Sequence, residues 1–306
     1  MENKEVIISV KNLTKDYKRG RGIFDISFDV YKGEIFGYCG TNGSGKTTTL
    51  RHIMGFLKPD KGSVTVKGMD AYKKAEYIKD FVGYLPGEIA FPDVQNGTEF
   101  LKIQAKMINL KDMSRAEHII NALQLDPTAN LRRMSKGMKQ KTALVAAFMH
   151  QPEIIILDEP TTGLDPLMRE EFIKLIKEEK EKGTTIIMSN HMFDELEETC
   201  DRIAFIKDGH LIDICDMNKL NNLPYRDYNI TFRKKSDFLL LSCVGFEIVE
   251  SIPKENTITV RLTKATANDF IRLMNGRELI AIKEKRHTLE EYFLERIGGE
   301  KNGKGN

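Results

Sequence analysis

Several features that narrow the function of a protein are scarce or missing in this sequence. Its 306 residues include no tryptophan and only 4 cysteines, and the cysteines lack the CxxC spacing typical of zinc sites. No apolar run is long enough to span a bilayer, and the amino terminus has no apolar stretch of signal-peptide length. We therefore expect a cytosolic protein with reduced thiols rather than a secreted or membrane-embedded one.

An excess of charge of either sign is also missing. The sequence has 47 Lys and Arg against 45 Asp and Glu, which gives a formal net charge of +2. Proteins that bind nucleic acid through its phosphates usually carry a clear basic excess. We therefore expect no nucleic-acid partner. The apolar fraction of 41% is that of an ordinary globular protein.

The order of predicted elements indicates two domains. Strand-like and helix-like segments alternate through residues 1–216, which predicts a mainly parallel sheet with helices on both faces and an antiparallel β subdomain at the start. Within this domain, residues 93–133 have the composition of a helical insert. Residues 217–297 are predicted to form a smaller α+β domain, and the polar tail 298–306 is expected to be disordered.

The individual elements follow from apolar periodicity and from turn residues. Strands are predicted at 6–10, 26–30, 34–38, 63–66, 81–85, 154–157, 185–188, 203–206, 228–232, 246–251 and 257–262. Helices are predicted at 134–148, 167–181, 192–199 and after 265.

The first motif with a chemical consequence is a glycine-rich loop between a predicted strand and a predicted helix. Residues 40–47 read GTNGSGKT, which fits the phosphate-binding pattern GxxxxGK[ST]. Backbone N–H groups of such a loop converge on phosphate oxygens, Lys46 reaches the outer phosphates, and Thr47 offers a hydroxyl to Mg²⁺. The candidate nucleotide-binding residues here are Gly40, Thr41, Asn42, Gly43, Ser44, Gly45, Lys46, Thr47 and Thr48.

Two adjacent carboxylates end a strongly apolar strand. The run Ile154–Leu157 is followed by Asp158 and Glu159. Because side chains alternate along a strand, the two carboxylates point in different directions. Asp158 can then hold Mg²⁺, and Glu159 can polarise an attacking water molecule as the catalytic base. The alternative is an acidic turn after a strand, which a nearby phosphate loop makes less plausible.

With these motifs the sequence resembles the ATP-binding-cassette (ABC) ATPases, the nucleotide-binding subunits of ABC transporters, over about residues 5–215. The segment 134–140, MSKGMKQ, is similar to the family signature LSGGQ, of which Ser135 and Gly137 are kept. The resemblance implies that these two residues open a helix that contacts the γ-phosphate of ATP. A plain capped helix is the alternative for this segment alone.

Three more positions match the family pattern. Asp165 stands at the place of the D-loop, and His191 stands at the place of the switch histidine, where the resemblance implies a catalytic contact with the γ-phosphate. Tyr17 resembles the aromatic residue that stacks on adenine, although an ordinary loop tyrosine is the alternative.

One position departs from the family. Where the family usually has a glutamine, this chain has Gly87 followed by Glu88. The amide that links Mg²⁺ and the attacking water to the membrane partner is therefore missing at this place. Two alternatives are open from sequence: Glu88 takes over the role of this amide, or another group does.

The resemblance also implies how the protein works. We expect an ATPase that uses ATP and Mg²⁺ and drives a membrane transporter, with export as the expected direction. Two cassettes would form a homodimer or a heterodimer on separate transmembrane permease subunits, and the chain would sit on the cytoplasmic face of the cell membrane. The alternative is a soluble ABC-type ATPase that acts on ribosomes or DNA.

Two further regions carry expectations from the resemblance. Residues 80–110 would form the groove for a membrane subunit, lined by Phe91, Val94 and Phe100, although these side chains are alternatively the core of the insert. The segment from Met217 onward resembles accessory domains of export-type, two-component transporters, with a role in dimer contact or regulation.

Overall fold

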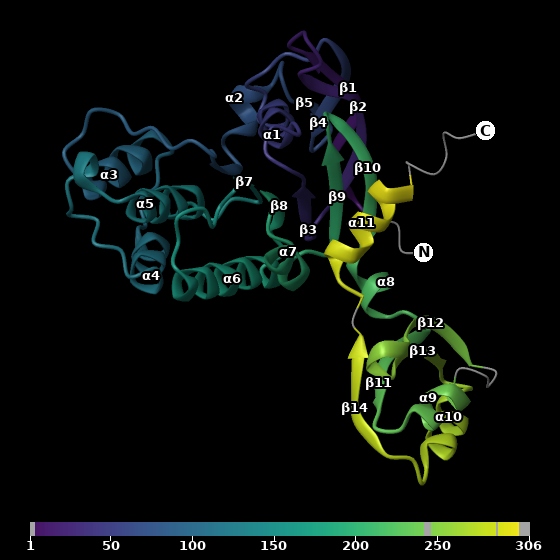
Figure 1. The fold of residues 1–306 in the computed structure, drawn as a ribbon. Coiled ribbons are helices and arrows are strands. Elements are labelled where there is room, and N and C mark those ends of the chain that lie inside the picture. The colour runs from purple at the N-terminus through teal and green to yellow at the C-terminus, as the bar shows by residue number, and fades with distance from the viewer. Residues whose placement is uncertain (1–3, 242–245, 286, 300–306) are drawn as a thin grey trace. The chain divides into compact units, whose positions relative to one another are not determined.

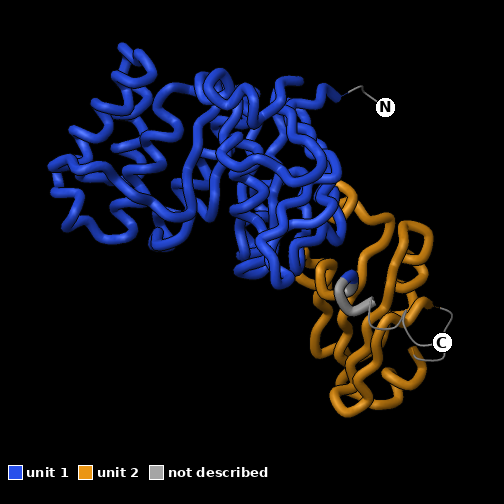
Figure 2. Tube along the Cα trace, turned by 90° about the horizontal axis from the view of Figure 1, so that it is seen from above, with its two compact units in different colours: residues 1–217, 296–306 blue, residues 218–295 orange. Residues whose placement is uncertain are grey.

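The computed structural model describes residues 4–241, 246–285 and 287–299 (Figure 1). The chain forms two compact units, one of residues 1–217 with 296–306 and one of residues 218–295 (Figure 2). All candidate nucleotide-binding and catalytic residues lie in the first unit, so the first unit positions the site.

The centre of the first unit is a six-stranded sheet in the order β10-β9-β3-β8-β7-β6. Its strands pair in parallel, except that β10 runs antiparallel to β9 at one edge. All residues of β3, β7 and β8 are buried, as expected of parallel strands covered on both faces. The strands are β3 (Ile35–Cys39), β6 (Val82–Leu85), β7 (Ile154–Asp158), β8 (Thr185–Asn190), β9 (Arg202–Lys207) and β10 (His210–Asp216).

A second, antiparallel sheet of four strands has the order β2-β1-β4-β5. Its strands are β1 (Val6–Asp16), β2 (Gly22–Tyr31), β4 (Lys61–Val66) and β5 (Met69–Asp70). Leu50 and Ile53 of α1 (Lys46–Ile53) share one apolar core with strands of both sheets. Both sheets therefore fix the helix that follows the phosphate loop.

Most other helices of the first unit surround the six-stranded sheet or form the insert. Helix α5 packs on β6, and α7 packs on β3. Helices α3, α4 and α5 lie together at one side of the unit (Figure 1). These helices are α2 (Ala75–Ile78), α3 (Gly97–Met107), α4 (Ser114–Ala122), η1 (Leu131–Arg133), α5 (Lys136–Phe148), α6 (Pro166–Glu181) and α7 (Phe193–Thr199).

The second unit is built on a four-stranded antiparallel sheet in the order β12-β13-β11-β14. Ile230 and Ile258 of the sheet share a buried core with Phe238 and Phe270 of its helices. Its elements are β11 (Tyr225–Phe232), α9 (Lys235–Leu241), β12 (Glu247–Ile252), η2 (Pro253–Glu255), β13 (Thr257–Thr263), α10 (Ala267–Met274) and β14 (Leu279–Lys285), and α8 (Met217–Asn221) joins the two units.

Several elements have no counterpart among those predicted from sequence, and the longest of them are β10, β14 and α9. Strands β10 and β14 each form one edge of a sheet, and edge strands are exposed enough to carry many polar residues and so lack a strong apolar pattern. Both sequences, HLIDICD and LIAIKEK, mix apolar and charged residues in this way. Helix α9 is short and adjoins residues 242–245, which lie outside the described part of the chain.

The end of the chain differs from the prediction. Helix α11 (Leu289–Gly299) includes the first two residues of the tail 298–306 that was expected to be disordered, and the rest of that tail lies outside the described residues. Arg296 and the residues of α11 that follow it group with the first unit rather than with the accessory domain predicted to end at 297. Arg296 contacts this unit through an ion pair, with its Nε 3.1 Å from Oδ2 of Asp213 in β10.

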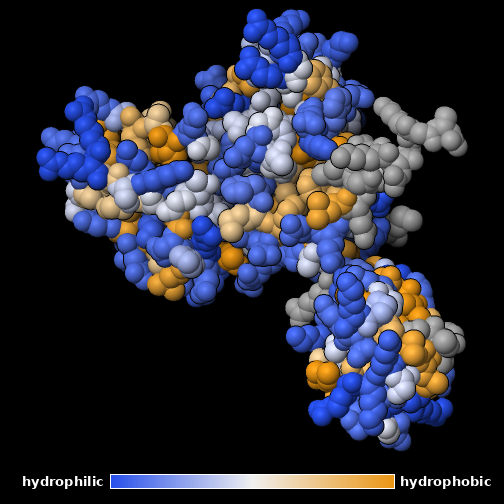
Figure 3. Space-filling view, in the orientation of Figure 1, coloured by the Kyte–Doolittle hydropathy of each residue, from blue (hydrophilic) through white to orange (hydrophobic). Residues whose placement is uncertain are grey.

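Hydrophobic residues on the face shown in Figure 3 form small patches among hydrophilic ones. Within the described chain, no helix combines the length and the hydropathy needed to cross a membrane.

Candidate ATP-hydrolysis site

The candidate residues gather at the carboxyl edge of the six-stranded sheet. Strand β3 ends at Cys39 directly before the phosphate loop, β7 ends at Asp158, and β8 ends at Asn190. Cys39 pairs with Asn190 and Asp158 pairs with Ser189, so the three strand ends are in register. The loops that follow parallel strands therefore meet at one place, where such sheets usually bind ligands.

The phosphate loop is shaped by its glycines. Gly45 has φ 109°, in the left-handed region, and a Cβ atom there would lie 2.5 Å from Cγ2 of Ile23. No side chain caps the amino terminus of α1, which begins at Lys46. The N–H groups of its first turn are therefore available to an anion, and the helix dipole adds positive potential at the same point.

Lys46, Glu159 and His191 form the charged centre of the site. The Lys46 ammonium is buried and donates to the carbonyl oxygens of Gly40 at 2.8 Å and Thr41 at 3.2 Å. It also lies 3.5 Å from Oε1 of Glu159, and Nδ1 of His191 lies 3.9 Å from the same oxygen. The Glu159 carboxylate thus stands between a fixed cation and a half-exposed imidazole.

Asp158 is fully buried, and only one of its two oxygens has a hydrogen-bond partner among the described residues. Oδ1 accepts a hydrogen bond from the Ser189 hydroxyl at 2.6 Å, and Oδ2 has no partner there. A buried carboxylate oxygen without a partner is suited to bind a cation or a cation-bound water. Burial, together with the charge of Asp158, raises the pKa of the Tyr84 phenol.

The position without the family glutamine lies directly against Asp158. A Cβ atom on Gly87 would stand 2.9 Å from Oδ2 and 3.1 Å from Cγ of Asp158. The Glu88 side chain, in contrast, is exposed. The glycine therefore leaves room for the carboxylate, which is a reason for its presence that the sequence pattern did not supply.

Replacing Gly87 with alanine is expected to lower kcat by about tenfold to a hundredfold, because displacing the Asp158 carboxylate by less than an ångström misaligns the reacting groups. Steady-state ATPase assays beside a thermal melt would measure this effect. A Gly87→Ala variant with unchanged kcat, next to a strongly impaired Glu88→Ala variant, would contradict this interpretation and assign the role of the missing amide to Glu88.

The signature residues lie on the same chain but apart from the phosphate loop. Ser135 caps α5 by accepting a hydrogen bond from the backbone N–H of Met138 at 3.2 Å, and Gly137 lies against the carbonyl of Gly163. In the described chain no hydrogen bond or ion pair joins Ser135 or Gly137 to the phosphate loop.

Asp165 caps a helix, and Tyr17 lies in the turn of a hairpin. The Asp165 side chain caps α6 by accepting from the N–H of Met168 at 3.0 Å. Tyr17 follows β1 in a hairpin whose second strand starts at Gly22, and its side chain is 45% exposed. The next residue of that strand, Ile23, packs against the phosphate loop at Gly45.

Buried polar residues that were not singled out from sequence support these groups. The Gln140 amide donates to the carbonyl oxygens of Pro160 at 2.8 Å and Glu159 at 3.3 Å. Ser189 and Asn190 end β8, and Glu195 in α7 is buried behind them. From sequence, Ser189 and Asn190 could have been found by their position as two polar residues at the end of an otherwise apolar strand.

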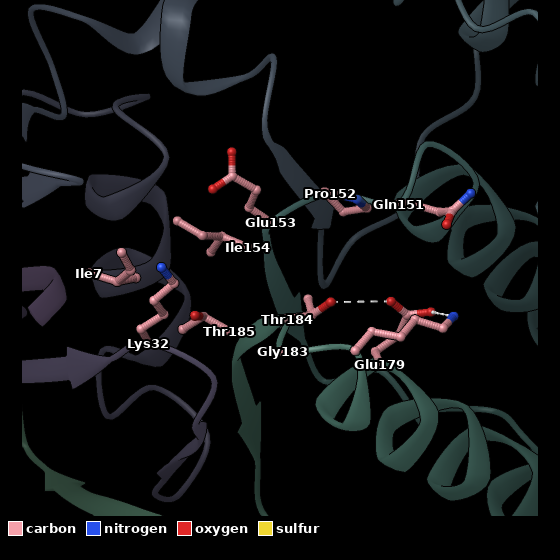
Figure 4. A pocket seen from close by; sticks show the side chains of 11 residues that line it. Ile7, Lys32, Gln151, Pro152, Glu153, Ile154, Glu179, Gly183, Thr184 and Thr185 are labelled. Atoms are coloured by element: carbon pink, nitrogen blue, oxygen red, sulfur yellow. Dashed lines mark hydrogen bonds and ion pairs between the residues drawn. The ribbon is translucent and has the colours of Figure 1, made fainter. Parts of the chain in front are cut away.

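A separate cavity of about 340 Å³ lies at the opposite, amino-terminal ends of β7 and β8 (Figure 4). It is lined by Glu153, Ile154, Thr184 and Thr185 among others. The buried Glu179 carboxylate at its side already accepts hydrogen bonds from Thr184 and Lys182. The cavity has no connection with the motifs at the carboxyl edge.

Comparisons with known proteins agree with the geometry of the site. A family model described as ABC transporter matches residues 23–162. The bacitracin transport ATP-binding protein BcrA of Bacillus licheniformis is 30% identical over 96% of this chain and 98% of its own length. The ABC transporter ATP-binding protein YhcH of Bacillus subtilis is 31% identical over 96% of this chain and 97% of its own.

A solved structure of an ATP-binding subunit of an ABC transporter superposes with a TM-score of 0.65 and 28% identity, and the match covers 70% of this chain and 92% of that one. The fold, the site and the relatives agree. This chain therefore belongs to the ABC transporter family, as an ATP-binding subunit whose ATPase activity powers a membrane transporter.

Proposed function

We propose that the residues at the carboxyl edge of the sheet bind ATP with Mg²⁺ and that Glu159 directs water at the γ-phosphate. The observation that carries the proposal is the position of the Glu159 carboxylate, next to the Mg²⁺ candidate Asp158 and between Lys46 and His191. Glu159 provides the base, Lys46 provides a cation for the phosphates, and His191 provides a second polar contact, all at one point.

The phosphates of ATP would bind along the loop of residues 40–48. The uncapped first turn of α1 supplies N–H donors, and Lys46 exchanges its contact with Glu159 for phosphate oxygens. This exchange frees the Glu159 carboxylate to accept a proton from water. The exposed ring of Tyr17 would stack on the adenine.

Thr47 and Asp158 would hold Mg²⁺. The partnerless Oδ2 of Asp158 fits this role, and the described residues contain no cluster of three or more acidic, His or Cys side chains that would hold a metal by itself. Phosphate oxygens and water would therefore complete the coordination. The ion, when bound, neutralises charge on the phosphates.

Two cassettes would complete each site. Because Ser135 and Gly137 lie apart from the phosphate loop of their own chain, they are placed to contact ATP bound to a second cassette. Asp165, at the exposed start of α6, would lie at the same interface. We propose a homodimer or a heterodimer of this kind on a pair of transmembrane permease subunits, at the cytoplasmic face of the cell membrane.

A groove at the helical insert suits the membrane partner. A cavity of about 370 Å³ is lined by Phe91 and Val94, with Leu131 and Lys139 at its other side. Phe100 does not line it: this ring is buried and meets Phe91 edge to face at 4.8 Å between ring centroids. Phe91 and Val94 therefore remain the groove residues, and Phe100 belongs to the core of the insert.

Co-purification from detergent-solubilised membranes of the host tests the proposal. We expect a hydrophobic, multi-span partner that cross-links to a photoreactive group at position 91 and raises an ATPase activity that Lys46→Ala abolishes. The same group at Glu76, which lies in α2 outside the groove, provides the control. Ribosomes or DNA in place of a membrane protein would support the soluble alternative.

A further inference from the structure

We propose that Glu195 is a positioning residue that holds His191 in place relative to Glu159. The inference rests on the proposed roles of these two residues. Glu195 lies in the first turn of α7, and its carboxylate is buried behind the site. One of its oxygens joins the two loops that carry the candidate catalytic side chains.

The first connection runs to the loop after β7. The Thr161 hydroxyl donates to Oε2 of Glu195 at 2.7 Å, and Thr161 is itself buried. Thr161 stands two residues after Glu159, and the turn continues through a hydrogen bond from the N–H of Leu164 to the Thr161 carbonyl at 3.0 Å. Glu195 therefore anchors the turn between Glu159 and Asp165.

The second connection runs to the loop after β8. The Asn190 amide donates to the same Oε2 atom at 2.5 Å. The amide oxygen of Asn190 in turn accepts from the backbone N–H of His191 at 2.7 Å and of Met192 at 3.0 Å. The path from the buried carboxylate to the backbone of His191 thus contains a single side chain.

The sheet and the charge of Glu195 both favour a stiff path. Asn190 ends a fully buried strand, so its Cα position is fixed by the sheet. A charged acceptor forms stronger hydrogen bonds than a neutral one, especially when buried. Arg169 of α6 provides the counter-charge, with its Nε 3.8 Å from the other carboxylate oxygen of Glu195.

His191 itself has no comparable support. Its side chain is 50% exposed, and its ring lies 3.9 Å from the carboxylate of Glu159. Without Glu195, Asn190 would lose the partner of its NH₂ group and be free to turn, and the two backbone N–H groups would lose their acceptor. The imidazole would then sample positions away from the γ-phosphate, while the phosphate loop would be untouched.

The expected result for Glu195→Ala is a kcat lower by about tenfold to a hundredfold, with an ATP dissociation constant changed less than about threefold. Glu195→Gln should recover most of the activity, because its amide oxygen can accept from both Thr161 and Asn190. Glu198→Ala is the matched control, since Glu198 lies on the same helix in an exposed ion pair with Lys177.

A double-mutant cycle separates positioning from general stabilisation. If Glu195 acts through His191, Glu195→Ala should have little further effect on kcat in a His191→Ala background. Should Glu195→Ala unfold the chain, Asn190→Leu breaks the same path at similar volume and enters the same cycle. Equal losses of kcat in both backgrounds would overturn the proposal.

Hydrogen exchange provides a readout that does not depend on catalysis. In the nucleotide-free chain, Glu195→Ala should speed exchange of the backbone N–H groups of His191 and Met192, whereas Glu198→Ala should not. Unchanged exchange at these two residues would overturn the proposal for Glu195. A His191→Ala variant with normal kcat would instead overturn the proposed role of His191.

Discussion

Glu159→Gln is expected to lower ATP turnover by about a hundredfold to ten-thousandfold, the usual contribution of a positioned base, while leaving ATP binding intact. Glutamine has the same shape but accepts no proton from water at neutral pH. It also removes the ion pair that joins Glu159 to Lys46 across 3.5 Å in the nucleotide-free site. Lys46 would then meet the phosphates without a competing carboxylate.

A second consequence follows for the assembly. If ATP is bound between two cassettes and not hydrolysed, the closed dimer should accumulate, because hydrolysis is the step that releases it. Gel filtration with ATP and Mg²⁺ should therefore show a dimer for Glu159→Gln. Under the same conditions Lys46→Ala, which removes the cation for the phosphates, should remain a monomer.

Glu153→Gln is the matched control for this experiment. Glu153 is the residue directly before β7, and Glu159 is the residue directly after it. Glu153 lies at the amino-terminal edge of the sheet and forms an exposed ion pair with Lys67. Its substitution changes the same charge and should leave kcat within about twofold of the wild type, as for most surface substitutions. Normal turnover in Glu159→Gln would show that another group activates water.

The fold class and the family could be predicted from sequence because their signals are local. The phosphate loop, the acidic pair after β7 and the apolar strands β3, β7 and β8 each occupy a few consecutive residues whose pattern has one simple physical meaning. The predicted α/β cassette with its antiparallel β subdomain and helical insert is confirmed. The ATP-binding and ATPase assignments are confirmed with it.

The contacts that hold the site together could not be predicted in this way. Glu195 meets Thr161 across 34 positions of sequence, and Gly87 meets Asp158 through packing alone. Such contacts depend on how strand ends and helix starts face each other, which no periodic pattern records. The weakly apolar edge strand β10 was missed for a related reason, since its pairing with β9 comes from the sheet rather than from its own sequence.

Glu179→Ala should destabilise the first unit by about 3–5 kcal/mol, because it removes one partner of a buried ion pair. Glu179 in α6 is 2% exposed and pairs with Arg115 of α4, which is 10% exposed. Lys182 and Thr184 also donate to the same carboxylate. The loss would be a large part of the stability of a typical domain, which is about 5–15 kcal/mol.

The neighbouring residue provides the control. Glu178 also contacts Arg115, with its Oε2 3.3 Å from Nη1, but it is 45% exposed. Exposed ion pairs contribute at most about 1 kcal/mol, so Glu178→Ala should hardly change stability. Because the chain has no tryptophan, urea unfolding should be followed by far-ultraviolet circular dichroism. If Glu179→Ala and Glu178→Ala lowered the free energy of unfolding equally, surface charge rather than the buried pair would govern stability.

The Arg115–Glu179 pair also has a consequence for motion. It joins the insert, through α4, to α6, whose N-cap is Asp165. The pair therefore ties α4 to α6 by a buried charge contact, and its removal should loosen α4. Glu179→Ala should therefore speed hydrogen exchange in α4 before global unfolding, and unchanged exchange there would show that the apolar contacts of α4 with α5 suffice to hold the insert.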